Sequence, residues 1–160
     1  MDATHLHLML NHVPVLGTAF GLGLLIFALW RKSEELKSAA LAFFVITALF
    51  SVPVYLTGEP AEDVVEPLAG VSKTIIEQHE NAAVVAFVGS LVLGVVALGR
   101  LILFRRKKIA SAWFGFVTLA SALIVGGLMT WTANLGGQIR HTEIRSGASP
   151  PAVHSTRDHD

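Results

Sequence analysis

The chain has 160 residues, of which 52% are hydrophobic and only 15% are charged, and its mean hydropathy is +0.60. This composition leaves too little polar surface for a soluble globular domain. The 12 basic and 12 acidic residues give a net charge of zero, and the sequence contains no cysteine. Disulfides, thiolate metal sites and covalently attached c-type haem are therefore excluded. The basic residues flank apolar segments, so we do not expect nucleic-acid binding.

Four apolar segments predict an all-α membrane protein built as a four-transmembrane-helix bundle. The segments span residues 13–30, 38–57, 82–104 and 109–133. Each is long enough to cross a hydrocarbon core of about 30 Å as a helix. In the first segment, Pro14 suits the first turn of a helix. Gly17 and Gly21 form a small-xxx-small pair, which predicts close approach of another helix.

Local signals predict where the later helices bend, begin and end. Pro53 is expected to kink the second helix. Thr74 and Glu77 have the spacing of a capping box, so we expect the third helix to start well before the membrane. Gly136 and Gly137 are expected to break the fourth helix.

The distribution of Lys and Arg predicts the orientation of the helices. Basic residues concentrate in the first and third connections, which are therefore expected to be cytoplasmic. These residues are Arg31, Lys32 and Lys37, and then Arg105, Arg106, Lys107 and Lys108. Both termini then face outward, N-out and C-out, together with an acidic loop over residues 58–81. We expect residues 1–145 to form the transmembrane domain and residues 146–160 a flexible tail, because the tail has two prolines and no apolar period.

All seven histidines are predicted to lie on the outer side, which makes that side the expected location of any chemistry. His79 shares a helical face with a run of small residues that begins at Ala83. Small residues in a membrane helix usually face other helices, so His79 is predicted to point into the bundle. His12 is predicted to point inward for the same reason, because Ala19 and Gly23 lie beneath it.

Two kinds of site are compatible with these outer residues. Two imidazoles from facing helices suit the axial positions of a b-type haem, whereas imidazole with carboxylate suits iron, copper or zinc. For haem, the first axial pair is His12 and His79. The reserve ligands are His7 and His141, and Arg140 is placed to pair with the propionates. The candidate non-haem ligands are His12, Glu59, Glu62, His79 and Glu80. Alternatively, these side chains are solvated groups at the membrane edge, where they cost little.

A short motif connects the histidines to the helix ends. It consists of His7-x4-His12-x-Pro14 at the first helix, His79 at the third, and Gly136-Gly137 followed by His141 at the fourth. In this motif, over about residues 5–143, the chain resembles a family of bacterial four-helix inner-membrane proteins of unknown function, some of which are joined to cytochrome c domains. The family opening is His-x4-His-Phe-Pro, whereas this chain has Val13 and a shorter interval before the final histidine. The resemblance implies a redox setting in a bacterial inner membrane, without supplying a reaction.

Three functions follow as hypotheses. The first is an inner-membrane electron-transfer protein that binds b-type haem near the periplasmic side, takes electrons from quinol and passes them to a periplasmic cytochrome. The second is a non-haem iron, copper or zinc protein that uses the histidines and carboxylates. The third is an accessory subunit of an oligomer or larger membrane complex. Its packing faces would be Gly17, Gly21, Gly94, Gly99, Gly126 and Gly127.

Overall fold

The computed structural model describes residues 2–105 and 112–145, and within these ranges it contains helices and no strand. In chain order the helices are α1 (Ala3–Leu10), α2 (His12–Arg31), α3 (Glu34–Leu56), α4 (Gly58–Val65), α5 (Lys73–Arg105), α6 (Ala112–Arg140) and the 3-10 helix η1 (Thr142–Ile144). The predicted tail over residues 146–160 lies outside the described residues, as does the connection over residues 106–111.

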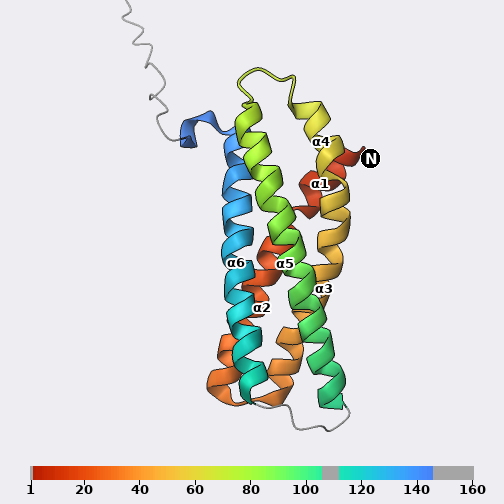
Figure 1. The fold of residues 1–160 in the computed structure, drawn as a ribbon, viewed down its shortest axis with the longest axis vertical. Helices are drawn as coiled ribbons and strands as arrows, with labels where there is room; N and C mark the ends of the chain where they lie inside the picture. Colours follow the sequence, from red (N-terminus) through yellow and green to blue (C-terminus); the bar gives the residue numbers. More distant parts are fainter. Residues whose placement is uncertain (1, 106–111, 146–160) are drawn as a thin grey trace, which may run out of the picture.

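The four long helices form an up-and-down bundle (Figure 1). Helix α2 contacts α3, α3 contacts α5, α5 contacts α6, and α6 returns to contact α2, so the four helices close a ring. The short α1 packs mainly against α4 and also contacts α3. Helices α1 and α4 therefore lie together at one end of the ring, next to the N-terminus (Figure 1).

In the part of the chain that the structure describes, four helical stretches are long and apolar enough to cross a membrane. They are Ala3–Arg31, Glu34–Leu56, Lys73–Leu103 and Gly115–Arg140. Large apolar side chains, among them Phe20, Val95 and Phe116, are exposed on the outside of the bundle. These features confirm the four apolar helices and give the chain the character of a multi-pass membrane protein. The orientation in the membrane stays a prediction.

Glycines and small side chains bring the helices into close contact. An added Cβ at Gly17 would come within 2.5 Å of Thr47 Oγ1, and one at Gly21 within 2.7 Å of Phe44 Cε1. Both neighbours lie on α3, so the predicted small-xxx-small pair does form a close helix contact. Phe44 is 1% exposed at the centre of this interface.

The helix boundaries follow the sequence signals only in part. Pro14 is the third residue of α2, as predicted, and its missing N–H explains why α1 and α2 are separate helices. Pro53 lies inside α3. Helix α5 starts at Lys73, so the prediction that Thr74 caps it is wrong. The predicted break at Gly136 and Gly137 is also wrong, because α6 continues through both glycines.

The two ends of the bundle differ in charge. The acidic end holds the N-terminus, α4, the start of α5 and η1 (Figure 1). Its acidic residues between α3 and the first turns of α5 are Glu59, Glu62, Asp63, Glu66, Glu77 and Glu80. The basic end holds the turn between α2 and α3, with Arg31, Lys32 and Lys37, and the last turn of α5. The separation of charge predicted from the connections is thus present in the fold.

Candidate functional site

His7 lies on α1 at the acidic end, and its ring is held by the end of α3. Its Nδ1 lies 3.0 Å from the carbonyl oxygen of Val54 and 3.3 Å from Oγ1 of Thr57. Val54 is one of the last four residues of α3, whose carbonyls lack partners inside the helix. The end of α3 therefore supplies an acceptor that fixes the His7 ring, which is half-buried.

His79 on α5 is fixed in the same way by α6. Its Nδ1 lies 3.0 Å from the carbonyl oxygen of Thr132 on α6. The ring is half-buried, and Ala86 and Ser90 on the same face of α5 are each 2% exposed. The prediction that His79 points into the bundle is therefore confirmed.

Gly136 makes room for the His79 ring. An added Cβ at this position would lie 3.0 Å from Cε1 and 3.3 Å from Nδ1 of His79. Such contacts are tighter than ordinary packing, so a side chain here would push the ring away from the Thr132 carbonyl. This glycine serves close packing of an imidazole against α6, which explains why it occurs within a continuous helix.

The hydrogen bonds also determine which ring nitrogens are free. A main-chain carbonyl oxygen can only accept, so the Nδ1 atoms of His7 and His79 carry the hydrogen and donate it. Each Nε2 is then left with its lone pair. Metal-binding histidines are commonly oriented in this way, with the second nitrogen donating to a carbonyl. We refer to His7 and His79 as the histidine pair, because each is anchored through Nδ1 to a main-chain carbonyl of another helix.

His12 does not belong to this pair. It lies on the exposed side of α2, together with Ala19 and Gly23, and an added Cβ at Gly23 would meet nothing within 4 Å. The predicted shared face of these three residues exists, but the prediction that it points inward is wrong. The buried face of α2 consists of Pro14, Thr18, Gly21, Leu25 and Ala28.

The remaining predicted histidine ligand, His141, is also exposed. Its Nδ1 lies 2.9 Å from Oε1 of Glu143, two residues further along the chain. His5 is similarly exposed, and its Nδ1 lies 3.2 Å from Oδ1 of Asp2. Both histidines therefore make local surface contacts, whereas the histidine pair makes contacts between elements far apart in sequence.

Two of the predicted carboxylates meet between α4 and α5. The side chains of Glu62 and Glu80 share a hydrogen bond, which is the largest of the causes that raise the pKa of Glu62 from its usual 4.5 to about 7. Burial and the negative charges of Glu80, Glu66 and Asp63 contribute to this same rise. A hydrogen bond between two carboxyl groups requires a proton on one of them, so the pair holds a proton near neutral pH.

The other residues near this pair do not complete a metal-ion site. Glu66 forms an ion pair with Lys73, and Glu59 is exposed on α4. Among residues 2–105 and 112–145, no three His, Asp or Glu side chains are grouped so that they could hold a metal ion. The structure thus brings Glu62 together with Glu80 and anchors His7 and His79 in the same way, but it does not assemble the five predicted non-haem ligands into one group.

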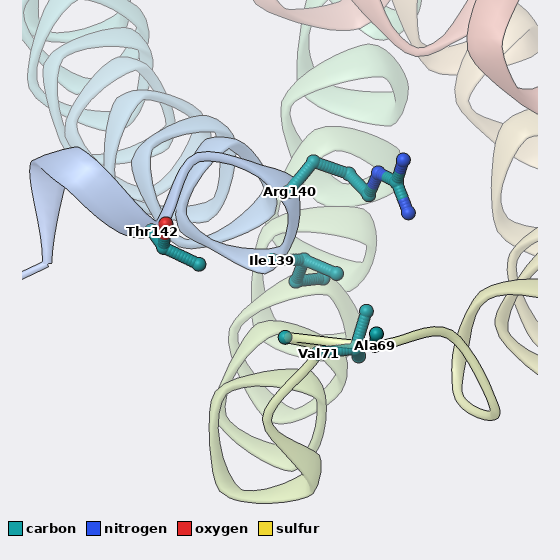
Figure 2. A pocket seen from close by; sticks show the side chains of 6 residues that line it. Ala69, Val71, Ile139, Arg140 and Thr142 are labelled. Atoms are coloured by element: carbon teal, nitrogen blue, oxygen red, sulfur yellow. The ribbon is translucent and has the colours of Figure 1, made fainter. Parts of the chain in front are cut away.

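Arg140 lies at the rim of a pocket of about 430 Å³ at the acidic end (Figure 2). The pocket is lined by Ala69, Gly70, Val71, Ile139, Arg140 and Thr142. Ile139 points toward Val71 and Ala69, whereas the Arg140 side chain extends away from Thr142 (Figure 2). Gly70 has a φ of +81°, which lets the connection between α4 and α5 turn tightly beside α6. Arg140 is exposed and remains available for an anionic group.

Compared with protein-family models, curated proteins and solved structures, the chain matches none of them. The family resemblance of the histidine motif therefore stays a prediction, and the function is argued from the site itself.

Proposed function

We propose that this chain is a membrane electron-transfer protein whose acidic end would hold a b-type haem, with His7 and His79 as the residues that would bind its iron. The proposal rests on one observation above all. Both rings are anchored through Nδ1 to main-chain carbonyls, at 3.0 Å in each case, and this leaves both Nε2 lone pairs for a ligand. His7 replaces His12 as the partner of His79, because His12 is on the exposed side of α2.

The surroundings of the histidine pair are compatible with a prosthetic group between helices. Small residues line the neighbouring elements: Ala61 on α4, and Ala82 and Ala86 on α5, are all buried. Asn11, which separates α1 from α2, has a buried Oδ1 without a hydrogen-bond partner in the described structure. A buried acceptor of this kind normally requires a donor, which a water molecule would supply.

The chain's own residues would set the properties of the site. Val54 and Thr132 would fix the ring orientations, and the anchored Nδ1–H groups would make the imidazoles better electron donors to the iron. Arg140 is the candidate partner for a propionate. When bound, the haem would carry one electron at a time between its ferric and ferrous states.

The partners and location belong to the same proposal. Four apolar helices support insertion in a lipid bilayer. The basic connection between α2 and α3 favours an orientation with the histidine pair at the periplasmic side of a bacterial inner membrane. A quinol in the membrane would be the electron donor, and a periplasmic cytochrome the acceptor.

Absorption spectra of oxidised and dithionite-reduced protein test this proposal. The protein would be expressed with ample haem and purified in detergent. We expect a Soret band, and a sharp α-band on reduction, in the wild type and in His12→Ala. Both bands should be lost or greatly weakened in His7→Ala and in His79→Ala. Absence of a Soret band from the wild type, or equal spectra in all four proteins, would overturn the haem assignment.

A non-haem metal ion on the histidine pair is the second candidate. The same Nδ1 anchoring favours it, because free Nε2 atoms also suit copper, iron or zinc. Elemental analysis of the same purified samples distinguishes the two candidates. Stoichiometric metal without a haem spectrum, lost in His79→Ala, would favour the metal ion. A protein with neither signal would favour the accessory subunit.

A further inference from the structure

Arg100 is a charged residue within the membrane-spanning part of α5, at the basic end of the bundle. It lies five residues before the end of α5 and within the apolar stretch Lys73–Leu103. Its Nη1 is buried and has no hydrogen-bond partner in the part of the chain that the structure describes. A guanidinium stays protonated in proteins and only donates hydrogen bonds, so a desolvated nitrogen without an acceptor is costly.

The side chain lies in the interface between α5 and α6. An added Cβ at Gly115 of α6 would be 3.7 Å from Nη1 of Arg100. Three helical turns earlier on α5, an added Cβ at Gly89 would contact Val125 and Leu128 of α6, so the two positions share the face that packs on α6. Gly115 leaves the space next to the guanidinium free of a side chain.

The protein offers few anions at this end. By sequence the helix ends and connections here carry Arg31, Lys32, Lys37, Arg100, Arg105, Arg106, Lys107 and Lys108 against only Glu34 and Glu35. Glu34 is already paired with Lys37 at 2.6 Å. The basic end therefore has an excess of positive charge that an external anion would balance.

We propose that Arg100 binds the phosphate group of an acidic phospholipid between α5 and α6. Guanidinium binds phosphate oxygens through two parallel hydrogen bonds, and basic pockets between membrane helices suit anionic headgroups. Exposed apolar side chains lie at the same level of the bundle, Ile102 on α5 and Trp113 and Phe116 on α6, and would contact acyl chains and the membrane interface. This site is at the opposite end of the bundle from the histidine pair and does not depend on haem.

Native mass spectrometry of the detergent-purified protein tests the proposal. Phosphatidylglycerol, phosphatidylcholine and inorganic phosphate are added separately to delipidated wild type, Arg100→Gln and Arg31→Gln. We expect the wild type to retain phosphatidylglycerol in preference to phosphatidylcholine. Arg100→Gln should bind phosphatidylglycerol about fivefold more weakly, the effect of one basic residue at an anionic surface. Arg31→Gln removes an equal charge from an exposed position at the same end and should bind as the wild type does.

The other outcomes are equally clear. Equal phosphatidylglycerol binding by the wild type and Arg100→Gln would overturn the site. Equal loss in Arg31→Gln would show that only the net charge matters, which also overturns it. If inorganic phosphate displaces phosphatidylglycerol at equal concentration, the ligand is free phosphate, and the proposal that the site binds a lipid is overturned. Arg100→Lys keeps the charge but lacks the two parallel hydrogen bonds of the guanidinium, so it should bind phosphatidylglycerol more strongly than Arg100→Gln and more weakly than the wild type.

Discussion

Gly136 of α6 lies against the ring of His79 of α5, so closely that an added Cβ would approach Cε1 to 3.0 Å. We predict that Gly136→Ala displaces the ring and weakens its hydrogen bond to the Thr132 carbonyl. Overpacking of a tight contact typically costs about 1–3 kcal/mol. Gly127→Ala is the matched control on the same helix, because an added Cβ there meets nothing within 4 Å. Thermal unfolding in detergent should show Gly136→Ala to be the less stable variant, and equal midpoints would contradict the packing.

The anchored rings of His7 and His79 predict a particular tautomer. Each should carry its hydrogen on Nδ1 when neutral, because Nδ1 donates to the carbonyl of Val54 or Thr132. Nitrogen-15 NMR of the imidazoles in ligand-free protein, at a pH where they are neutral, measures this directly. Exposed His12 should show the usual exchange between tautomers.

This test needs assignment by substitution. The signals of a fixed Nδ1–H tautomer should disappear one at a time in His7→Gln and His79→Gln. An Nε2–H tautomer for either residue would mean that its Nδ1 does not donate to the carbonyl, and the proposed ligand role of that residue would fail.

The sequence predicts the bundle well because its signals are local. Apolar runs fix the number of long helices, and the small-xxx-small pair of Gly17 and Gly21 fixes a close contact whose partner on α3 emerges only in the fold. The inward direction of the His79 side chain follows from the run of small residues on the same face of its helix. In each case a property of one segment is sufficient.

The histidine pair itself was less predictable. His12 has small residues beneath it, yet that face of α2 is exposed, because the face with Gly21 is the one buried against α3. His7 acquires its role from the packing of α1 beside α3 and α4, a contact between distant segments that helical periodicity does not encode. The predicted helix break at Gly136 is wrong for a related reason. A glycine is typical both of a helix end and of a close contact between helices, and only the position of the His79 ring distinguishes the two.

Close packing between α2 and α3 predicts contrasting effects for two glycines on one helix. Gly21→Ala would place its Cβ 2.7 Å from Phe44 Cε1, whereas Gly23→Ala would meet nothing within 4 Å. Phe44 is almost completely buried, so its ring has little room to move. We expect Gly21→Ala to lower stability by about 1–3 kcal/mol, and Gly23→Ala to leave it unchanged or raise it by up to about 1 kcal/mol through helix propensity. Titration with a denaturing detergent measures the change in unfolding free energy for both variants. If Gly23→Ala were the more destabilised variant, α2 would pack through another face.

The carboxyl pair of Glu62 and Glu80 predicts a pH dependence of stability. The hydrogen bond to Glu80, together with burial and the neighbouring negative charges, raises the pKa of Glu62 from 4.5 to about 7. Between these values the folded protein therefore binds more protons than the unfolded chain does. This contribution to stability is therefore complete below pH 4.5, and it is lost as the pH rises through about 7.

Glu62→Gln separates this pair from other titrating groups. The carboxamide still donates a hydrogen bond to Glu80 but does not titrate, so the thermal midpoint should fall less between pH 4.5 and 7 than in the wild type. Glu59→Gln is the control, because Glu59 is an exposed residue on the same helix. Its midpoints should follow the wild-type curve. If Glu62→Gln also follows that curve, the proton is not shared between α4 and α5, and the pair does not hold α4 beside the start of α5.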